Sequence, residues 1–271
     1  MVLLEIALAP ILIGLVSLAE RKWGNRISGL LVGMPLTSGP VLLILAVDHG
    51  STFASRAAVG CLLGQFALAA FTVTYARVAR SLRWVAALSV GVVVYLSVAA
   101  ALLKLPMKDG VVFVLVCVVL AAALVAFPRT SAAAGRPVAM ANRELVARMA
   151  VAAGIVVLLT TAAKMLGPEV AGLLAPFPVY TGILAVFNHV RSADSAISVM
   201  RGVTTGAFGA TAFCGVVMAG ASLPRGLCFT LAALAAFGAQ LLIFPLARQL
   251  GQRQVASDTA SGTGSERQHP A

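Results

Sequence analysis

Charge is scarce in this sequence of 271 residues. Only 11% of the residues are Asp, Glu, Lys or Arg, while 60% are hydrophobic and the mean hydropathy is +0.99. A soluble domain has roughly a quarter of its residues charged, and a soluble fold of this length has too little interior to bury so much apolar surface. The shortage of charge therefore excludes an ordinary soluble protein and predicts that lipid surrounds most of the chain.

Residues that bind metals or perform catalysis are rare as well. The chain has nine Asp and Glu residues and three histidines, and its four cysteines lie in apolar stretches without C-x-x-C spacing. We place His49 and His189 at opposite membrane faces and His269 in a tail, so they cannot share a metal, which needs clustered ligands. Walker A, G-x-S-x-G and H-E-x-x-H motifs are absent. These absences predict no cofactor, no metal and no catalytic residue, and they exclude nucleotide hydrolysis by this chain as an energy source.

The alternation of apolar and polar residues that marks barrel strands is also missing. Only helices and closed barrels span a bilayer, and barrel strands alternate. Residues 111–127 are instead apolar on every face. We therefore predict an all-α polytopic membrane protein, in which the G-x-x-x-G pair Gly60 and Gly64 marks a close crossing of two helices.

Nine apolar segments are long enough, or nearly so, for the roughly 20 residues that a helical crossing needs. With the N-terminus outside, fifteen of the twenty Lys and Arg residues fall on the inner side, as the positive-inside rule requires. Removing one segment would move every later basic cluster to the other side, so this bias supports the count. It also explains the net charge of +11 without nucleic acid as a partner. The segments are 2–19, 28–47, 57–76, 84–103, 110–127, 147–163, 170–189, 202–221 and 226–247.

One motif occurs twice, as GLLVGMPLTSG from Gly29 and as GLLAPFPVYTG from Gly172. Further matches at nearly the same offset predict an internal duplication, in which the first copy covers segments one to four and the second covers segments six to nine. Because one extra crossing separates two copies of four crossings, the copies must have opposite orientations, as in many secondary transporters. The matches outside the motif are Ala19 with Ala162, Arg21 with Lys164, Gly24 with Gly167, Gly60 with Gly202, Gly64 with Gly206, Phe66 with Phe208, Ala70 with Ala212 and Phe71 with Phe213.

This duplication predicts how the chain is divided. Residues 1–104 form the first four-helix repeat, residues 105–146 a linker helix with a cytoplasmic loop, and residues 147–247 the second, inverted repeat. Residues 248–271 are rich in Gln, Ser, Gly and Thr, which predicts a disordered cytoplasmic tail. The expected fold class is thus an all-α membrane protein of about nine transmembrane helices, arranged as two four-helix inverted-topology repeats joined by a linker helix.

Prolines interrupt the second and seventh segments at equivalent places. An interior proline removes a backbone hydrogen bond and clashes with the preceding turn, at a cost of about 3 kcal/mol, and the freed groups then need protein or water around them. Matching interruptions in two halves indicate a transport site. The alternative is a pair of packing kinks whose hydroxyls bond to the preceding turn. The predicted substrate-binding residues are Pro35, Thr37, Ser38, Gly39, Pro178, Tyr180, Thr181 and Gly182.

Four more residues are secondary candidates. Glu5 is an intramembrane carboxylate, which indicates function unless the residue lies in the headgroup layer. Arg21 and Lys164 are repeat-equivalent basic residues on opposite faces, where they either attract an anionic substrate or extend to the interface. His189 lies near the end of an interrupted segment, where it either caps the helix or takes part in proton coupling.

These features predict a secondary transporter, flippase or exporter of a small or amphipathic metabolite. Its expected partners are the lipid bilayer, the small-molecule substrate and a coupling ion, unless the substrate's own gradient supplies the energy. Two alternatives stay open: a membrane-embedded enzyme acting on a lipid or biosynthetic substrate, and a channel or accessory membrane subunit. The high content of Ala, Arg and Gly is typical of a GC-rich bacterial genome and predicts the inner (cytoplasmic) membrane, with the N-terminus outside and the C-terminus cytoplasmic.

Two stretches carry a family resemblance, VAGLLAPFPVYTGILAVFNHV from Val170 and ISGLLVGMPLTSGPVLLILAVDHG from Ile27. Each resembles the small GlpM-type four-helix inner-membrane proteins, so that the whole chain looks like a tandem duplication of such a unit. The resemblance implies that a four-helix unit can exist alone. It brings no substrate and no residue roles.

Overall fold

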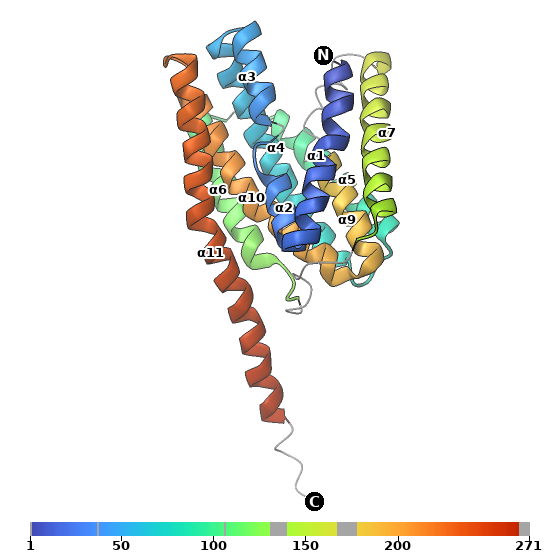
Figure 1. The fold of residues 1–271 in the computed structure, drawn as a ribbon. Helices are drawn as coiled ribbons and strands as arrows, with labels where there is room; N and C mark the ends of the chain where they lie inside the picture. The colour runs from blue at the N-terminus through green and yellow to red at the C-terminus, as the bar shows by residue number, and fades with distance from the viewer. Residues whose placement is uncertain (1, 37, 106, 131–139, 167–177, 266–271) are drawn as a thin grey trace, which may run out of the picture.

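The computed structural model describes residues 2–36, 38–105, 107–130, 140–166 and 178–265, with side chains except at 2–9, 159–166, 248 and 250–265. These residues form ten α-helices, and no strand occurs among them, so the predicted all-α class is confirmed. The helices are α1 Val2–Trp23, α2 Asn25–Gly33, α3 Ser38–Asp48, α4 Ser51–Val78, α5 Trp84–Leu103, α6 Asp109–Ala126, α7 Asn142–Leu166, α9 Val179–Arg191, α10 Ala193–Ala219 and α11 Arg225–Ser265 (Figure 1).

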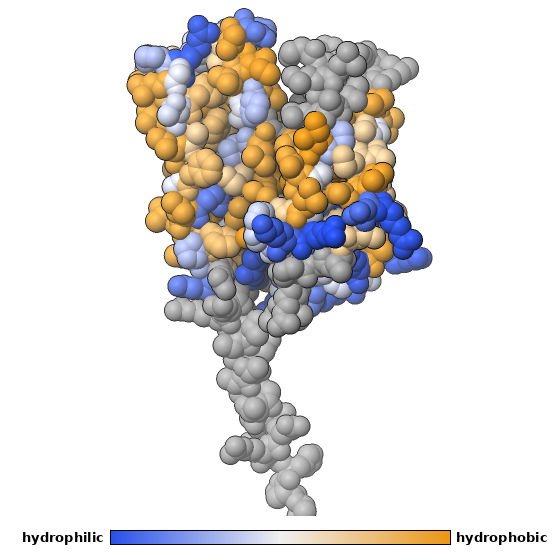
Figure 2. Space-filling view, viewed as in Figure 1, coloured by the Kyte–Doolittle hydropathy of each residue, from blue (hydrophilic) through white to orange (hydrophobic). Residues whose placement is uncertain are grey.

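Six helical segments in the described part of the chain are long and apolar enough to cross a membrane. They are Asn25–Asp48, which combines α2 and α3, Ser51–Val78, Trp84–Leu103, Asp109–Ala126, Ala193–Ala219 and Arg225–Ala247. Apolar side chains cover most of the face shown in Figure 2, as expected for a surface in contact with lipid tails. The chain is therefore a helical membrane protein.

Two predicted segments differ clearly from the helices. α10 begins at Ala193, nine residues before the predicted start at 202. The prediction began too late because the polar residues Asp194 and Arg201 lower the hydropathy of the first turns. The Ser192 hydroxyl caps this early start by accepting a hydrogen bond of 3.0 Å from the Ser195 amide. α11 continues to Ser265, through most of the predicted disordered tail. Its Gln, Arg and Ala residues favour helix, which needs only local hydrogen bonds and no core.

Glycine makes two of the reversals between helices possible. Gly24, between α1 and α2, and Gly50, between α3 and α4, both have a φ of 90°. A side chain would be strained in this region of backbone space, whereas glycine adopts it readily. The chain can therefore turn back within one residue after α1 and within two residues after α3.

Several helix ends gather at one end of the molecule, which we call the basic end. α1, α4, α6 and α9 finish there, while α7 and α10 begin there. Figure 2 shows polar side chains along this lower rim. The contacts that join these ends are Arg21 to Asn142, Arg77 to the Ala126 carbonyl, Arg80 to Asp194 and Arg191 to Glu144.

The opposite end holds the other helix ends. There the Ser55 hydroxyl, in the first turns of α4, donates a hydrogen bond of 2.7 Å to the Met218 carbonyl at the end of α10. Arg225, at the start of α11, donates to the Ala46 carbonyl near the end of α3. The combined span of α2 and α3 therefore runs from the basic end to the opposite end, and α4 runs back.

Two pairs of helices that are far apart in the sequence pack antiparallel. Residue numbers rise along the first helix of each pair as they fall along the second. For α4 and α10 the contacts are Ser55 with Met218, Cys61 with Cys214 and Thr72 with Thr204. For α1 and α7 they are Gly14 with Met149, Ser17 with Arg148 and Arg21 with Asn142.

α10 is the central helix of the described structure. Within α10, 67% of the most apolar stretch is buried inside the protein. The corresponding share is 18–33% for the other five membrane-length segments. α10 contacts α2, α4, α6, α9 and α11. Its glycines make this possible, because their missing side chains let neighbouring helices approach closely.

The closest helix crossing joins α2 to α10. A Cβ on Gly29 would lie 2.2 Å from the Val199 carbonyl oxygen, and a Cβ on Gly206 would lie 2.1 Å from the Leu30 carbonyl oxygen. At Gly60, the first glycine of the predicted pair Gly60 and Gly64, no close crossing is found among the described residues, since a Cβ there would meet no atom within 4 Å. The G-x-x-x-G pair Gly202 and Gly206 makes a close contact with α2.

Candidate functional site

The second predicted span is interrupted where its sequence indicated. α2 ends at Gly33, and Met34 is extended, with a ψ of 163°. Pro35 and Leu36 form a turn, and α3 begins at Ser38. The first hydrogen bond after the break runs from the Gly39 amide to the Pro35 carbonyl, at 2.9 Å.

The seventh predicted span has a similar hydrogen bond at the start of α9. Pro178 precedes the first residue of α9, and the Gly182 amide donates to its carbonyl at 2.9 Å. Pro178 and Gly182 are the repeat equivalents of Pro35 and Gly39. At both occurrences of the motif, therefore, the proline carbonyl accepts a hydrogen bond from the glycine amide four residues later. The chain from 167 to 177, before this point, lies outside the described residues.

The predicted substrate-binding residues are placed only in part. Gly39 lies against the Phe213 ring of α10, whereas Gly182 lies against Leu88 of α5. Thr181 is buried in the first turn of α9, while Thr37 lies outside the described residues. The two glycines thus have different neighbours, although α2 and α9 are in contact. A role of the two interruptions in one shared substrate site stays a prediction.

Two of the secondary candidates have partners at the basic end. Arg21 is exposed and donates to the Asn142 side chain at 3.2 Å. The His189 ring forms a hydrogen bond of 2.9 Å with the Tyr75 hydroxyl, which joins α9 to α4. The side chains of Glu5 and Lys164 lie outside the described residues.

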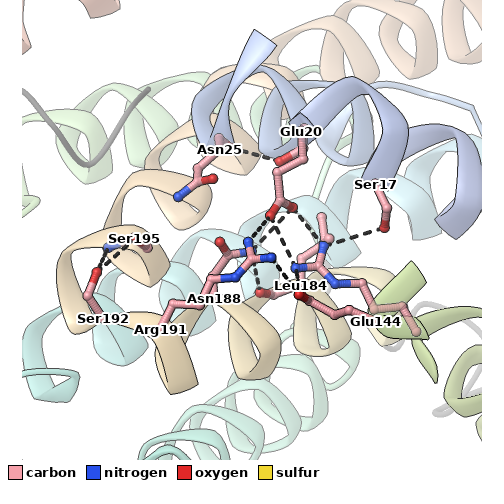
Figure 3. A network of polar contacts seen from close by, with 11 residues as sticks. Ser17, Glu20, Asn25, Glu144, Leu184, Asn188, Arg191, Ser192 and Ser195 are labelled. Carbon is pink, nitrogen blue, oxygen red and sulfur yellow. Dashed lines mark hydrogen bonds and ion pairs between the residues drawn. The ribbon is translucent and has the colours of Figure 1, made fainter. Parts of the chain in front are cut away.

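A cluster of charged residues that the sequence interpretation missed lies beside Arg21. It contains two carboxylates and two guanidinium groups: Glu20 from α1, Glu144 and Arg148 from α7, and Arg191 from α9. We call these four residues the ion-pair ring. Figure 3 shows the Glu20 carboxylate at its centre, with Glu144, Asn188 and Arg191 around it.

Each carboxylate of the ring accepts from both arginines. Arg148 binds Glu20 through two hydrogen bonds, of 2.8 and 3.1 Å, and binds Glu144 at 2.9 Å. Arg191 closes the ring, with Nη1 3.0 Å from Glu20 and Nη2 2.6 Å from Glu144. The Asn188 amide adds a longer hydrogen bond of 3.3 Å to Glu20. Three helices are thereby linked by charged contacts.

Burial divides the ring into an inner and an outer side. The side chains of Glu20 and Arg148 have 0% exposure, whereas Arg191 and Glu144 are 21% and 24% exposed. Removing charges from water is costly, and a buried pair compensates for that cost only with good geometry and further hydrogen bonds. The forked contact between Glu20 and Arg148 supplies this geometry, and Ser17 at 3.4 Å and Asn188 add hydrogen bonds, while the Arg148 Nε has no hydrogen-bond partner in the described part of the chain.

A signal for this ring was present in the sequence. Glu20 is one of only nine acidic residues, and it follows directly after the predicted first span of 2–19. The rule that a carboxylate within the membrane region indicates function was applied to Glu5 alone. Because α1 extends to Trp23, Glu20 lies within the helix as well.

Comparisons with known proteins add no assignment. No protein-family model matches the chain, and no curated protein or solved structure shows significant similarity to it. Within the described ranges, no group of three or more His, Cys, Asp or Glu residues is placed to hold a metal ion. The interruption at Pro35, the matching sequence motif at Pro178 and the ion-pair ring are therefore the features on which a functional proposal can rest.

Proposed function

We propose that this protein is a secondary transporter of a small or amphipathic metabolite that works by alternating access. In this proposal nine spans form two inverted four-helix repeats, related by a pseudo-two-fold axis in the membrane plane, with α6 between them. The basic end faces the cytoplasm, and the interruptions at Pro35 and Pro178 contribute to the substrate site.

One observation carries the proposal: helices that are equivalent in the two sequence repeats pack antiparallel against each other. α4 and α10 contain the matched Gly, Phe and Ala residues of the third and eighth predicted segments. Their contacts run in opposite directions from Ser55 with Met218 to Thr72 with Thr204. α1 and α7, which contain the first and sixth predicted segments, also pack antiparallel. A two-fold axis in the membrane plane produces this packing, whereas a parallel duplication would not.

Other helix contacts occur in equivalent pairs. α4 packs against α5 as α10 packs against α11, and α3 packs against α4 as α9 packs against α10. The linker α6 contacts both α4 and α10. These correspondences support two copies of one bundle, with α6 as the element that joins them.

Inverted repeats favour alternating access for a physical reason. If the two repeats exchange their conformations, a state open to one side becomes a state open to the other. The two states are close in free energy because their parts are nearly equivalent, so a substrate or ion with modest differential affinity can shift the population between them.

The geometry of the half-helices suggests which substrates to test first. α3 has 11 residues and α9 has 13, and at about 1.5 Å per residue each covers little more than half of a hydrocarbon core about 30 Å thick. Their N-termini therefore lie near the middle of the membrane, because α3 and α9 end at opposite membrane faces. Helix N-termini favour negative charge, so organic anions are the first class to assay.

Flux measurements in proteoliposomes test the proposed function. The variants Pro35→Ala and Pro178→Ala restore an amide donor and remove the proline clash, so each should let the chain run on as helix through the interruption. We expect both to lose most of the flux of organic anions. Pro245→Ala is the matched control, because Pro245 lies within the continuous helix α11 and is exposed, and this variant should retain full flux.

The same assay separates the alternatives. An enzyme would convert its substrate in detergent without a gradient, and a channel would conduct without saturation or exchange of labelled substrate across the membrane. Normal flux in both Pro35→Ala and Pro178→Ala would contradict the proposed site. Conversion of substrate in detergent without transport would contradict the transporter.

A further inference from the structure

We propose that the ion-pair ring is the cytoplasmic gate of this transporter and that it opens when α9 moves away from α1 and α7. The inference rests on the proposed function, since a gate requires a pathway. Its basis is the position of the ring, the helices that the ring joins and the unequal burial of its members.

The ring joins the two repeats at the basic end. Glu20 belongs to the first repeat, while Arg148 and Arg191 belong to the second, and Glu144 lies in the first turn of α7, just before residue 147. Arg191 is the last residue of α9, and the interruption at Pro178 lies at the other end of the same half-helix. A shift of α9 that changes the interruption therefore also moves Arg191 relative to Glu20 and Glu144.

The contacts of the ring are suited to opening on one side. Glu20 and Arg148 are fully buried and joined by two hydrogen bonds, so separating them would remove the forked contact that compensates for the burial of both charges. Arg191 and Glu144 are partly exposed, and water can replace the contacts of Arg191 as it leaves.

Departure of α9 leaves the rest of the ring paired. Arg148 keeps both Glu20 and Glu144, and α1 stays joined to α7. Only Arg191 and the Asn188 amide lose their contacts to these carboxylates. When the gate opens, α9 therefore moves, while the Glu20–Arg148 pair keeps α1 and α7 together.

Accessibility of a cysteine behind the ring tests the gate. Ser17 lies one turn before Glu20 on α1, is fully buried and accepts a hydrogen bond from Arg148. Ser17→Cys, in a chain whose four native cysteines are replaced, is exposed to a membrane-impermeant maleimide from the cytoplasmic side. The variant Arg191→Gln removes the ion pairs of Arg191 with Glu20 and Glu144. Glu144→Gln weakens the attachment of α9 from the other side of the same contact.

The matched control is Arg80→Gln. Arg80 also forms an ion pair at the basic end, with Asp194 at 2.8 Å, and also links the two repeats, but it lies outside the ring. We expect Arg191→Gln and Glu144→Gln to raise the labelling rate at position 17 about tenfold or more, the effect of a tenfold shift in the open population. Arg191→Lys, which keeps the charge but not the fork, should give an intermediate rate. Arg80→Gln should leave the rate unchanged.

Equal labelling rates in the parent chain, Arg191→Gln and Glu144→Gln would overturn the gate, as would an equal increase in Arg80→Gln. Size-exclusion chromatography identifies any variant that has unfolded, and the remaining ring variant then decides. The labelling needs no substrate. Failure of the gate therefore appears as unchanged labelling with normal flux, whereas failure of the proposed function appears as absent flux in the parent chain.

Discussion

Glu20 and Arg21 are neighbours in the sequence but have different environments. Arg21 is exposed and contacts one side chain of α7, whereas Glu20 is fully buried and contacts Asn188 and two arginines. The basic residue was predicted as a candidate because it has a repeat equivalent in Lys164. The acidic residue was missed, because a single sequence does not reveal which arginines fold back onto it from α7 and α9, more than 120 positions away.

The first prediction at this scale concerns the buried ion pair. Arg148→Met keeps an unbranched apolar side chain but removes the guanidinium group and leaves the Glu20 carboxylate with less compensation, so we expect a loss of about 3–5 kcal/mol of stability. Arg80→Met removes an exposed ion pair and should cost at most about 1 kcal/mol. Unfolding of both variants by SDS in mixed micelles measures the difference. Similar losses in the two would show that burial does not determine the strength of these pairs.

At the scale of the helices, the sequence predicted where helices and breaks occur better than it predicted which helix faces contact one another. The fourth predicted segment coincides with α5 at Trp84–Leu103, and the interruption at Pro35 is present, because hydropathy and proline geometry are local properties. The sequence assigned a close crossing to Gly60 and Gly64, but a Cβ on Gly60 would meet no atom of the described residues within 4 Å, whereas Gly206 on α10 lies in the close crossing with α2. Which face of a helix contacts a neighbour depends on the packing of the whole bundle, so the G-x-x-x-G spacing alone could not identify the crossing.

The crossing of α2 and α10 gives a prediction for this scale. In Gly206→Ala the new Cβ would lie 2.1 Å from a backbone oxygen of α2 and 2.9 Å from the Gly33 Cα, so the two helices must separate. We expect a loss of about 1–3 kcal/mol from this overpacking. Gly238→Ala in α11 is the control, since a Cβ there meets nothing within 4 Å and alanine gains up to about 1 kcal/mol in helix propensity. Equal stability of the two variants in the same micelle titration would contradict the close crossing.

At the scale of the whole molecule, the proposed transport mechanism requires two repeats with opposite orientations. Composition and the missing alternation of apolar and polar residues predicted an all-helical membrane protein, and six membrane-length segments are found in the described residues. The count of nine spans and the inversion came from two further sequence features, the basic residues between segments and the repeated proline motif. Neither feature gives the substrate, because the side chains around the interruptions come from several helices.

Side-specific labelling of two equivalent loops tests the inversion most directly. Ser81 lies between α4 and α5, and Ser222 lies between α10 and α11, and both are exposed. Ser81→Cys and Ser222→Cys, each made in a chain without other cysteines, are labelled with an impermeant maleimide in intact cells and in inside-out vesicles. The account predicts that position 81 reacts only from the cytoplasmic side and position 222 only from the outside. Labelling of both positions from the same side would contradict it.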